Sequence, residues 1–137
     1  MPRVSRDSKL LALKTVPLFA GLSKRDLASV GSIADELDVR AGKELIREQE
    51  PGRQFFILLE GEVEVRRRGR KVAVLGPGDF FGEIALVSDR LTNATVTTLG
   101  SARIVVITRT AFSRLLREAP QLQLRVLEAV AKRLPDE

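Results

Sequence analysis

The chain has 137 residues, of which 44% are apolar, and a formal net charge of +5. This is the size of one domain with one apolar core. It contains no Cys and no His, which excludes disulfides, thiol chemistry, His-ligated metal sites and His-dependent catalytic triads. No apolar run approaches the roughly 18 residues of a membrane span, and the N-terminus has no signal-peptide pattern. We therefore expect a cytoplasmic binding module that is not an enzyme and uses no cofactor or metal.

The first part of the chain, residues 1–37, has a helical pattern. Pro17 and Gly21 interrupt it after a first leucine-rich segment. Ser23 begins the sequence SKRD, a Ser-x-x-Asp capping box that is typical of a helix start. Apolar residues then follow at helical spacing: Leu27, Val30, Ile33 and Leu37. We predict N-terminal helices over residues 1–37.

The middle of the chain, residues 38–108, has the texture of short strands. Apolar or alternating runs occur at residues 54–60 (QFFILLE), 62–65 (EVEV), 94–98 (ATVTT) and 102–108 (ARIVVIT), separated by turn residues. Many short strands at near-regular spacing are typical of a small antiparallel barrel. The predicted fold class is mainly β, a double-stranded β-helix (jelly-roll) barrel flanked by N- and C-terminal α-helices.

The densest basic run, RRRGRK at residues 66–71, lies between EVEV and the alternating residues Val72 and Val74. We interpret it as the solvated tip of a hairpin. The alternative is a surface for nucleic acid or anionic lipid. No aromatic residue is interleaved with the run, so stacking on bases is not expected.

The last part, residues 109–137, returns to helix. Thr108 can cap the first of two helices, and Pro120 suits the first turn of the second. The apolar residues of 121–134 cover more than one stripe. The excess could cover a ligand, meet a second copy of the chain, or pack fully inside the domain. The whole chain is thus predicted to be a single domain over residues 1–137.

The stretch FGEIALVSDRLTNATV, residues 81–96, has the features of an anion pocket. A short helix starting near Gly82 would leave backbone N–H groups that favour an anion, and Gly82 allows close approach of a ligand. Glu83 could cap its own helix or accept hydrogen bonds from the hydroxyls of a ribose. This combination suits a phosphorylated sugar better than free phosphate. A plain strand–turn–helix corner would use the same residues.

The order of VPLFAGLS, FFILLEGEVEV, LGPGDFFGEIAL and ATV resembles the cyclic-nucleotide-binding domains of catabolite activator proteins, kinase regulatory subunits and cyclic-nucleotide-gated channels. The resemblance covers nearly the whole chain. It implies an eight-stranded jelly-roll barrel with flanking helices, in which residues 81–96 are a phosphate-binding cassette. The final helix, residues 121–134, is then implied to be a lid over the base.

The resemblance also implies roles for individual residues. Glu83 matches the acid that holds the ribose 2′-hydroxyl. Backbone donors to the cyclic phosphate correspond to Gly82, Ile84 and Ala85. Ala94 matches the small residue that opens the strand behind the phosphate.

The cassette departs from the family at one position. Where the family places an Arg that pairs with the phosphate, this chain has Thr92. The next position, which the resemblance implies influences the preference for adenine or guanine, is Asn93. Arg90, two residues earlier, is a second candidate for the phosphate contact. Losing a charge-assisted hydrogen bond of roughly 1.5–3 kcal/mol would weaken binding about 10-fold to 150-fold.

Two functions follow as hypotheses. The first is a regulatory module that binds cAMP or cGMP and couples binding to movement of the C-terminal helices. The alternative is a protein-interaction or dimerisation module that kept the barrel and lost the ligand, with a homodimer or effector protein bound through the C-terminal helices. A cupin-like metalloenzyme is disfavoured by the absence of His. No helix-turn-helix pattern is present, so we expect no DNA-binding domain.

Overall fold

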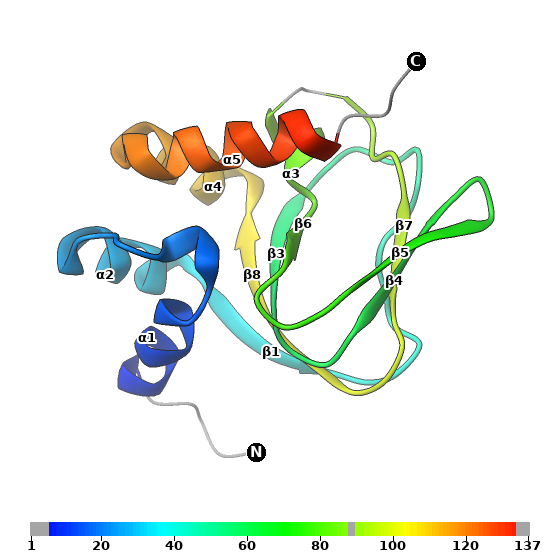
Figure 1. Cartoon of the computed structure of the whole chain (residues 1–137), viewed down its shortest axis with the longest axis horizontal. Helices are drawn as coiled ribbons and strands as arrows, with labels where there is room; N and C mark the ends of the chain where they lie inside the picture. The colour runs from blue at the N-terminus through cyan, green and yellow to red at the C-terminus, as the bar shows by residue number, and fades with distance from the viewer. Residues whose placement is uncertain (1–5, 88–89, 134–137) are drawn as a thin grey trace.

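The computed structural model describes residues 6–87 and 90–133 of the chain. Figure 1 shows helices gathered on one side and β-strands on the other. The N-terminal helices are α1 (Arg6–Lys14), the 3-10 turn η1 (Pro17–Phe19) and α2 (Lys24–Ile33). A short helix, α3 (Glu83–Val87), interrupts the strands, and α4 (Arg109–Glu118) and α5 (Pro120–Arg133) follow them.

The strands form two antiparallel sheets. The first has the order β1 (Asp35–Val39), β8 (Ala102–Thr108), β3 (Gln54–Glu60) and β6 (Phe80–Phe81). The second has the order β2 (Glu44–Ile46), β7 (Thr95–Thr98), β4 (Val63–Arg67) and β5 (Arg70–Leu75). This arrangement confirms the predicted class, mainly β with flanking helices. Among the described residues no strand pairing joins the two sheets into a closed barrel.

The central strands of the first sheet, β3 and β8, are buried on both faces, which explains their continuous apolar runs. Side chains of a strand alternate between its faces. Phe55 and Ile57 belong to the core beneath the helices, whereas Phe56 and Leu58 belong to the core between the sheets. Phe55 stacks on Phe112 of α4 with ring centroids 4.4 Å apart. The sheet that carries β6 and α3 is therefore held firmly from both sides.

The N-terminal helices confirm one prediction and correct another. The Ser23 hydroxyl accepts a hydrogen bond from the Asp26 amide at 3.1 Å, as a helix cap does. However, α2 ends at Ile33, and Leu37 lies on β1, where it is 47% exposed. The predicted boundary at residue 38 was wrong, because antiparallel pairing of residues 35–39 with β8 outweighs the helical spacing of one leucine.

The C-terminal helices begin where the sequence indicated. The Thr108 hydroxyl accepts from the Ala111 amide at 3.2 Å, and Pro120 opens α5. One face of α5 is buried through Leu122, Val126 and Val130, while two leucines on it, Leu124 and Leu127, are at least half exposed. The predicted apolar excess is therefore present on the surface, and a partner for it stays a prediction. Within the described residues, no helix is both long enough and apolar enough to cross a membrane.

The basic run forms the hairpin that the sequence predicted. Arg67 of β4 pairs with Arg70 of β5. The two residues between them, Arg68 and Gly69, both have positive φ, 54° and 77°. Two positive φ angles are characteristic of the tight turns that join twisted antiparallel strands.

Candidate ligand-binding site

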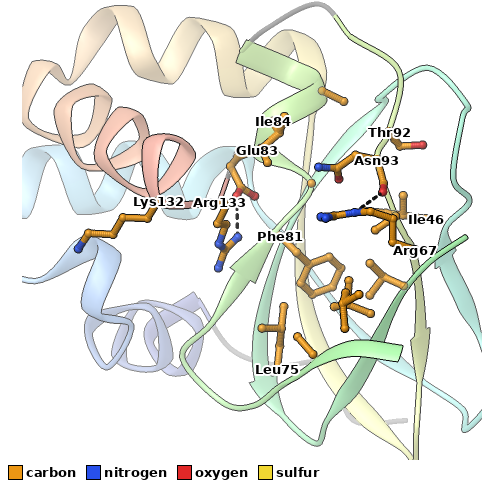
Figure 2. Close-up of a pocket in the computed structure, with 17 residues that line it drawn as sticks. Ile46, Arg67, Leu75, Phe81, Glu83, Ile84, Thr92, Asn93, Lys132 and Arg133 are labelled. Atoms are coloured by element: carbon orange, nitrogen blue, oxygen red, sulfur yellow. Dashed lines mark hydrogen bonds and ion pairs between the residues drawn. The ribbon is translucent and has the colours of Figure 1, made fainter. Parts of the chain in front are cut away.

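A cavity of about 440 Å³ lies between the second sheet, α3 and the end of α5. Its volume is in the range that small-molecule sites occupy. Apolar side chains of β4 and β5 form one wall, and the polar residues lie at the end of β4, at α3, just before β7 and at the end of α5 (Figure 2). The lining residues are Ile46, Val65, Arg67, Val72, Ala73, Leu75, Phe81, Gly82, Glu83, Ile84, Ala85, Thr92, Asn93, Ala94, Val96, Lys132 and Arg133.

Gly82 makes the sharp connection from β6 into α3. Its φ is +92°, in the region that side chains rarely adopt. A Cβ atom there would lie 2.8 Å from the Gln54 carbonyl oxygen. Only glycine fits this position without movement of the backbone, and the turn directs the next residue, Glu83, into the cavity wall.

Glu83 is the most deeply buried acid of the cavity wall, with 1% of its surface exposed. Its carboxylate Oε1 accepts a hydrogen bond of 2.6 Å from Nη1 of Arg133 in the last turn of α5 (Figure 2). Arg133 also donates to the Phe80 carbonyl at 2.6 Å and lies 4.6 Å from the centre of the Phe80 ring. The buried charge is thus neutralised by a residue 50 positions later in the chain, as buried carboxylates require.

Thr92 contributes to the wall, but its hydroxyl is engaged elsewhere. It donates to the Arg47 carbonyl at 2.5 Å and accepts from the Glu50 amide at 3.1 Å. Backbone bonds join Thr92 to the same loop through Gln49 and Glu50. Thr92 therefore fixes the connection between β2 and β3 against the start of β7, and its hydroxyl proton is not directed into the cavity.

Asn93 is hydrogen-bonded to Arg67, a residue that was not among the predicted site residues. Its backbone carbonyl accepts a 3.1 Å hydrogen bond from Nε of Arg67, the last residue of β4 (Figure 2). The sequence carried a signal for this placement. Val63, Val65 and Arg67 occupy alternate positions, which point to one face of a strand, and Val63 is fully buried.

The cavity brings together most of the predicted site residues and leaves one out. Seven of them line it: Gly82, Glu83, Ile84, Ala85, Thr92, Asn93 and Ala94. Arg90 is exposed and does not line the cavity, while residues 88–89 of the predicted cassette lie outside the described residues. Lys132 and Arg133 place the end of α5 at the cavity rim. In residues 6–87 and 90–133 no cluster of three or more acids could hold a metal ion.

Comparison with known proteins identifies relatives of this domain. The chain is 32% identical over 124 residues to the cAMP-dependent protein kinase regulatory subunit of Dictyostelium discoideum, which covers 85% of this chain and 38% of the relative. It is 35% identical over 105 residues to the subunit of the same name from Eremothecium gossypii, covering 76% of this chain and 23% of the relative. The chain thus spans well under half the length of these relatives.

Solved structures show the same fold. The regulatory domain of Toxoplasma gondii PKA, solved with cAMP, superposes with a TM-score of 0.80 at 25% identity over 90% of this chain and 49% of that one. The profile of the cyclic nucleotide-binding domain matches residues 36–119, a span that contains both sheets, Gly82, Glu83 and the whole predicted cassette. This chain belongs to the cyclic nucleotide-binding domain family.

Proposed function

We propose that this domain binds a cyclic nucleotide, cAMP or cGMP, in the cavity beside α3 and transmits binding to α5. The observation that carries the proposal is Glu83, a carboxylate that is 1% exposed yet lines a cavity of about 440 Å³. Buried carboxylates are rare unless they are paired or functional. Here one oxygen is paired, and we infer that the residue is the ribose-binding acid that the resemblance to the family implies.

The ribose is the part of the ligand that Glu83 would hold. Oε1 accepts from Arg133, while Oε2 has no hydrogen bond to any residue in the described parts of the chain. A 2′-hydroxyl could donate to Oε2 and leave the Arg133 bond in place. Hydrogen bonds to a charged acceptor are about twice as strong as those between neutral groups.

The apolar wall suits the base. Val65, Val72 and Leu75 line the cavity from β4 and β5, and Val72 is 50% exposed. Burial of a flat heterocycle against such side chains is favourable at roughly 25 cal/mol per Å² of apolar surface. The kinase regulatory subunits among the relatives are named cAMP-dependent, and the Toxoplasma gondii regulatory domain was solved with cAMP, which makes cAMP the first ligand to test.

The ion pair between Glu83 and Arg133 provides the route to α5. A ligand bound to Glu83 would share its carboxylate with the last turn of that helix, so ligand and helix position are energetically coupled. We propose that binding holds the end of α5 against the cavity rim. In this reading the domain is a regulatory module and not an enzyme.

The experiment is a calorimetric titration of the purified chain with cAMP and with cGMP. Binding at micromolar concentration or tighter by either nucleotide supports the proposal, and the tighter one identifies the ligand. Absence of heat and of thermal stabilisation with both nucleotides would overturn it. That result would favour the alternative function, a protein-interaction module that kept the fold.

A further inference from the structure

The polar wall of the cavity contains a cation that has no anionic partner among the described residues. Arg67 is half-buried, and its Nε donates to the Asn93 carbonyl. Its two terminal amino groups make no hydrogen bond and no ion pair within residues 6–87 and 90–133. The cavity's buried acid, Glu83, is already paired with Arg133. A guanidinium in a partly desolvated wall gains most from an anion that can accept two hydrogen bonds.

The neighbouring arginines of the hairpin differ from Arg67. Arg66 forms an ion pair with Glu64 and donates to the Gly69 carbonyl. Arg70, the cross-strand neighbour of Arg67, is exposed and does not line the cavity. The strand alternation that buries Val63 also places Arg67 on the inner face. One arginine of the basic run therefore belongs to the cavity, while its neighbours belong to the hairpin surface.

Arg67 lies next to the part of the cassette where the resemblance implies a phosphate-binding arginine. Its Nε bond to the Asn93 carbonyl holds the guanidinium beside the residue that follows Thr92. Thr92 is the position at which the resemblance to the family implies a phosphate-binding arginine. The Thr92 hydroxyl is bonded to the loop between β2 and β3, so residue 92 itself supplies no charged donor to this side of the cavity. In Figure 2 the Arg67 guanidinium lies next to Asn93, on the side of the view toward Glu83.

We propose that Arg67 supplies the cation for the cyclic phosphate of the ligand, from β4 and not from the cassette. The inference rests on the proposed function. Nε stays on the Asn93 carbonyl, and the free terminal amino groups donate to the phosphate oxygens. The domain has thereby kept a charge-assisted phosphate contact although residue 92 is a threonine.

Calorimetric titrations of the full chain test this assignment with ligands that differ only in the phosphate. The probes are cAMP and cGMP, with adenosine and guanosine as the counterparts that lack it. The variants are Arg67→Gln and the matched control Arg70→Gln, which removes the same charge from the cross-strand position. Thermal unfolding of each variant establishes that it is folded.

We expect Arg67→Gln to weaken binding of the cyclic nucleotide about 10-fold to 150-fold, the range for loss of a charge-assisted hydrogen bond. Its affinity for the nucleoside should stay within about 2-fold of the natural sequence, and Arg70→Gln should change neither affinity by more than that. Arg67→Lys, which keeps the charge, should lose less than Arg67→Gln.

Three results would overturn the inference. If Arg67→Gln and Arg70→Gln lose the same amount, the effect is long-range charge. If Arg67→Gln weakens nucleotide and nucleoside equally, Arg67 only positions Asn93. If the natural sequence binds neither cyclic nucleotide, both the proposed function and this role of Arg67 are wrong. That result can be distinguished from the first two, in which the natural sequence still binds.

Discussion

Arg133 and Glu83 lie 50 residues apart in the chain and are joined by a 2.6 Å hydrogen bond between Nη1 and Oε1. The bond links the last turn of α5 to the first residue of α3. Glu83 is almost fully buried, whereas the Arg133 side chain is 32% exposed. The residue proposed to hold the ligand and the helix proposed to respond to it are therefore in direct contact, without an intermediate chain of residues.

Replacement of Glu83 should weaken ligand binding without unfolding the domain. We expect Glu83→Ala to weaken the affinity for the cyclic nucleotide about 10-fold to 150-fold, because one charge-assisted hydrogen bond of roughly 1.5–3 kcal/mol is lost. Glu83→Gln keeps an acceptor oxygen and should lose less. Glu118→Ala removes the same charge from an exposed position on α4 and is the control in the same titration. Unchanged affinity in Glu83→Ala would refute the ribose contact.

The ion pair itself should show energetic coupling in a double-mutant cycle. Arg133→Ala leaves a buried carboxylate unpaired and should lower the free energy of unfolding by about 1–3 kcal/mol. In the Glu83→Gln background the same replacement should cost at least about 0.5 kcal/mol less. Urea denaturation of the four proteins measures this difference. Additive effects would mean that the pair contributes nothing specific to stability.

The same arginine should determine whether α5 senses the ligand. With saturating nucleotide, amide hydrogen exchange at residues 126–133 should slow in the natural sequence, because the ligand and α5 share Glu83. In Arg133→Ala the ligand should still bind, but this slowing should disappear. Lys132→Ala, the adjacent replacement of equal charge, serves as the comparison. Slowing of equal size in Arg133→Ala would show that the coupling takes another route.

Gly82 should tolerate alanine less well than a glycine in an open turn. Gly69 also has positive φ, +77°, but nothing lies within 4 Å of a Cβ placed there. Gly69→Ala should therefore cost only the conformational term, about 1–2 kcal/mol. Gly82→Ala adds a contact of 2.8 Å with the Gln54 carbonyl oxygen and should lower the unfolding free energy further. Equal thermal stability of the two variants would contradict the close approach.

Thr92 should behave as a structural residue. Thr92→Val keeps the shape but removes the two hydrogen bonds that the hydroxyl makes with the Arg47 carbonyl and the Glu50 amide, at a net cost of about 0.5–1.5 kcal/mol each. Thr97→Val is the control, because the Thr97 side chain is only half-buried and makes no hydrogen bond within the described parts of the chain. Chemical denaturation compares them. If the two variants unfold at the same denaturant concentration, the bonds of the Thr92 hydroxyl do not stabilise the loop.

The local signals in the sequence predicted most elements, because those signals act over a few residues. Ser23, Thr108 and Pro120 mark helix starts through capping and backbone geometry, and all three lie where expected. The hairpin at residues 66–71 follows from strand alternation and one glycine. Gly82 and Glu83 could likewise be assigned, since their order after two phenylalanines is a local pattern. Leu37 was misplaced because its pairing partner in β8 is distant in the sequence.

The tertiary structure alone decided which charges meet in the cavity. Arg67, Glu83 and Arg133 come from three elements, β4, α3 and α5, and no local pattern specifies their distances. The sequence by itself predicted the fold class, because the spacing of apolar and turn residues follows from backbone geometry. It also predicted that Glu83 lies at the start of a short helix in the wall of the site. How α5 and β4 pack decides which arginine pairs with that acid, and which one faces the cavity with no acidic partner in the described parts of the chain. Packing sets those contacts through long-range burial, which short-range periodicity does not encode.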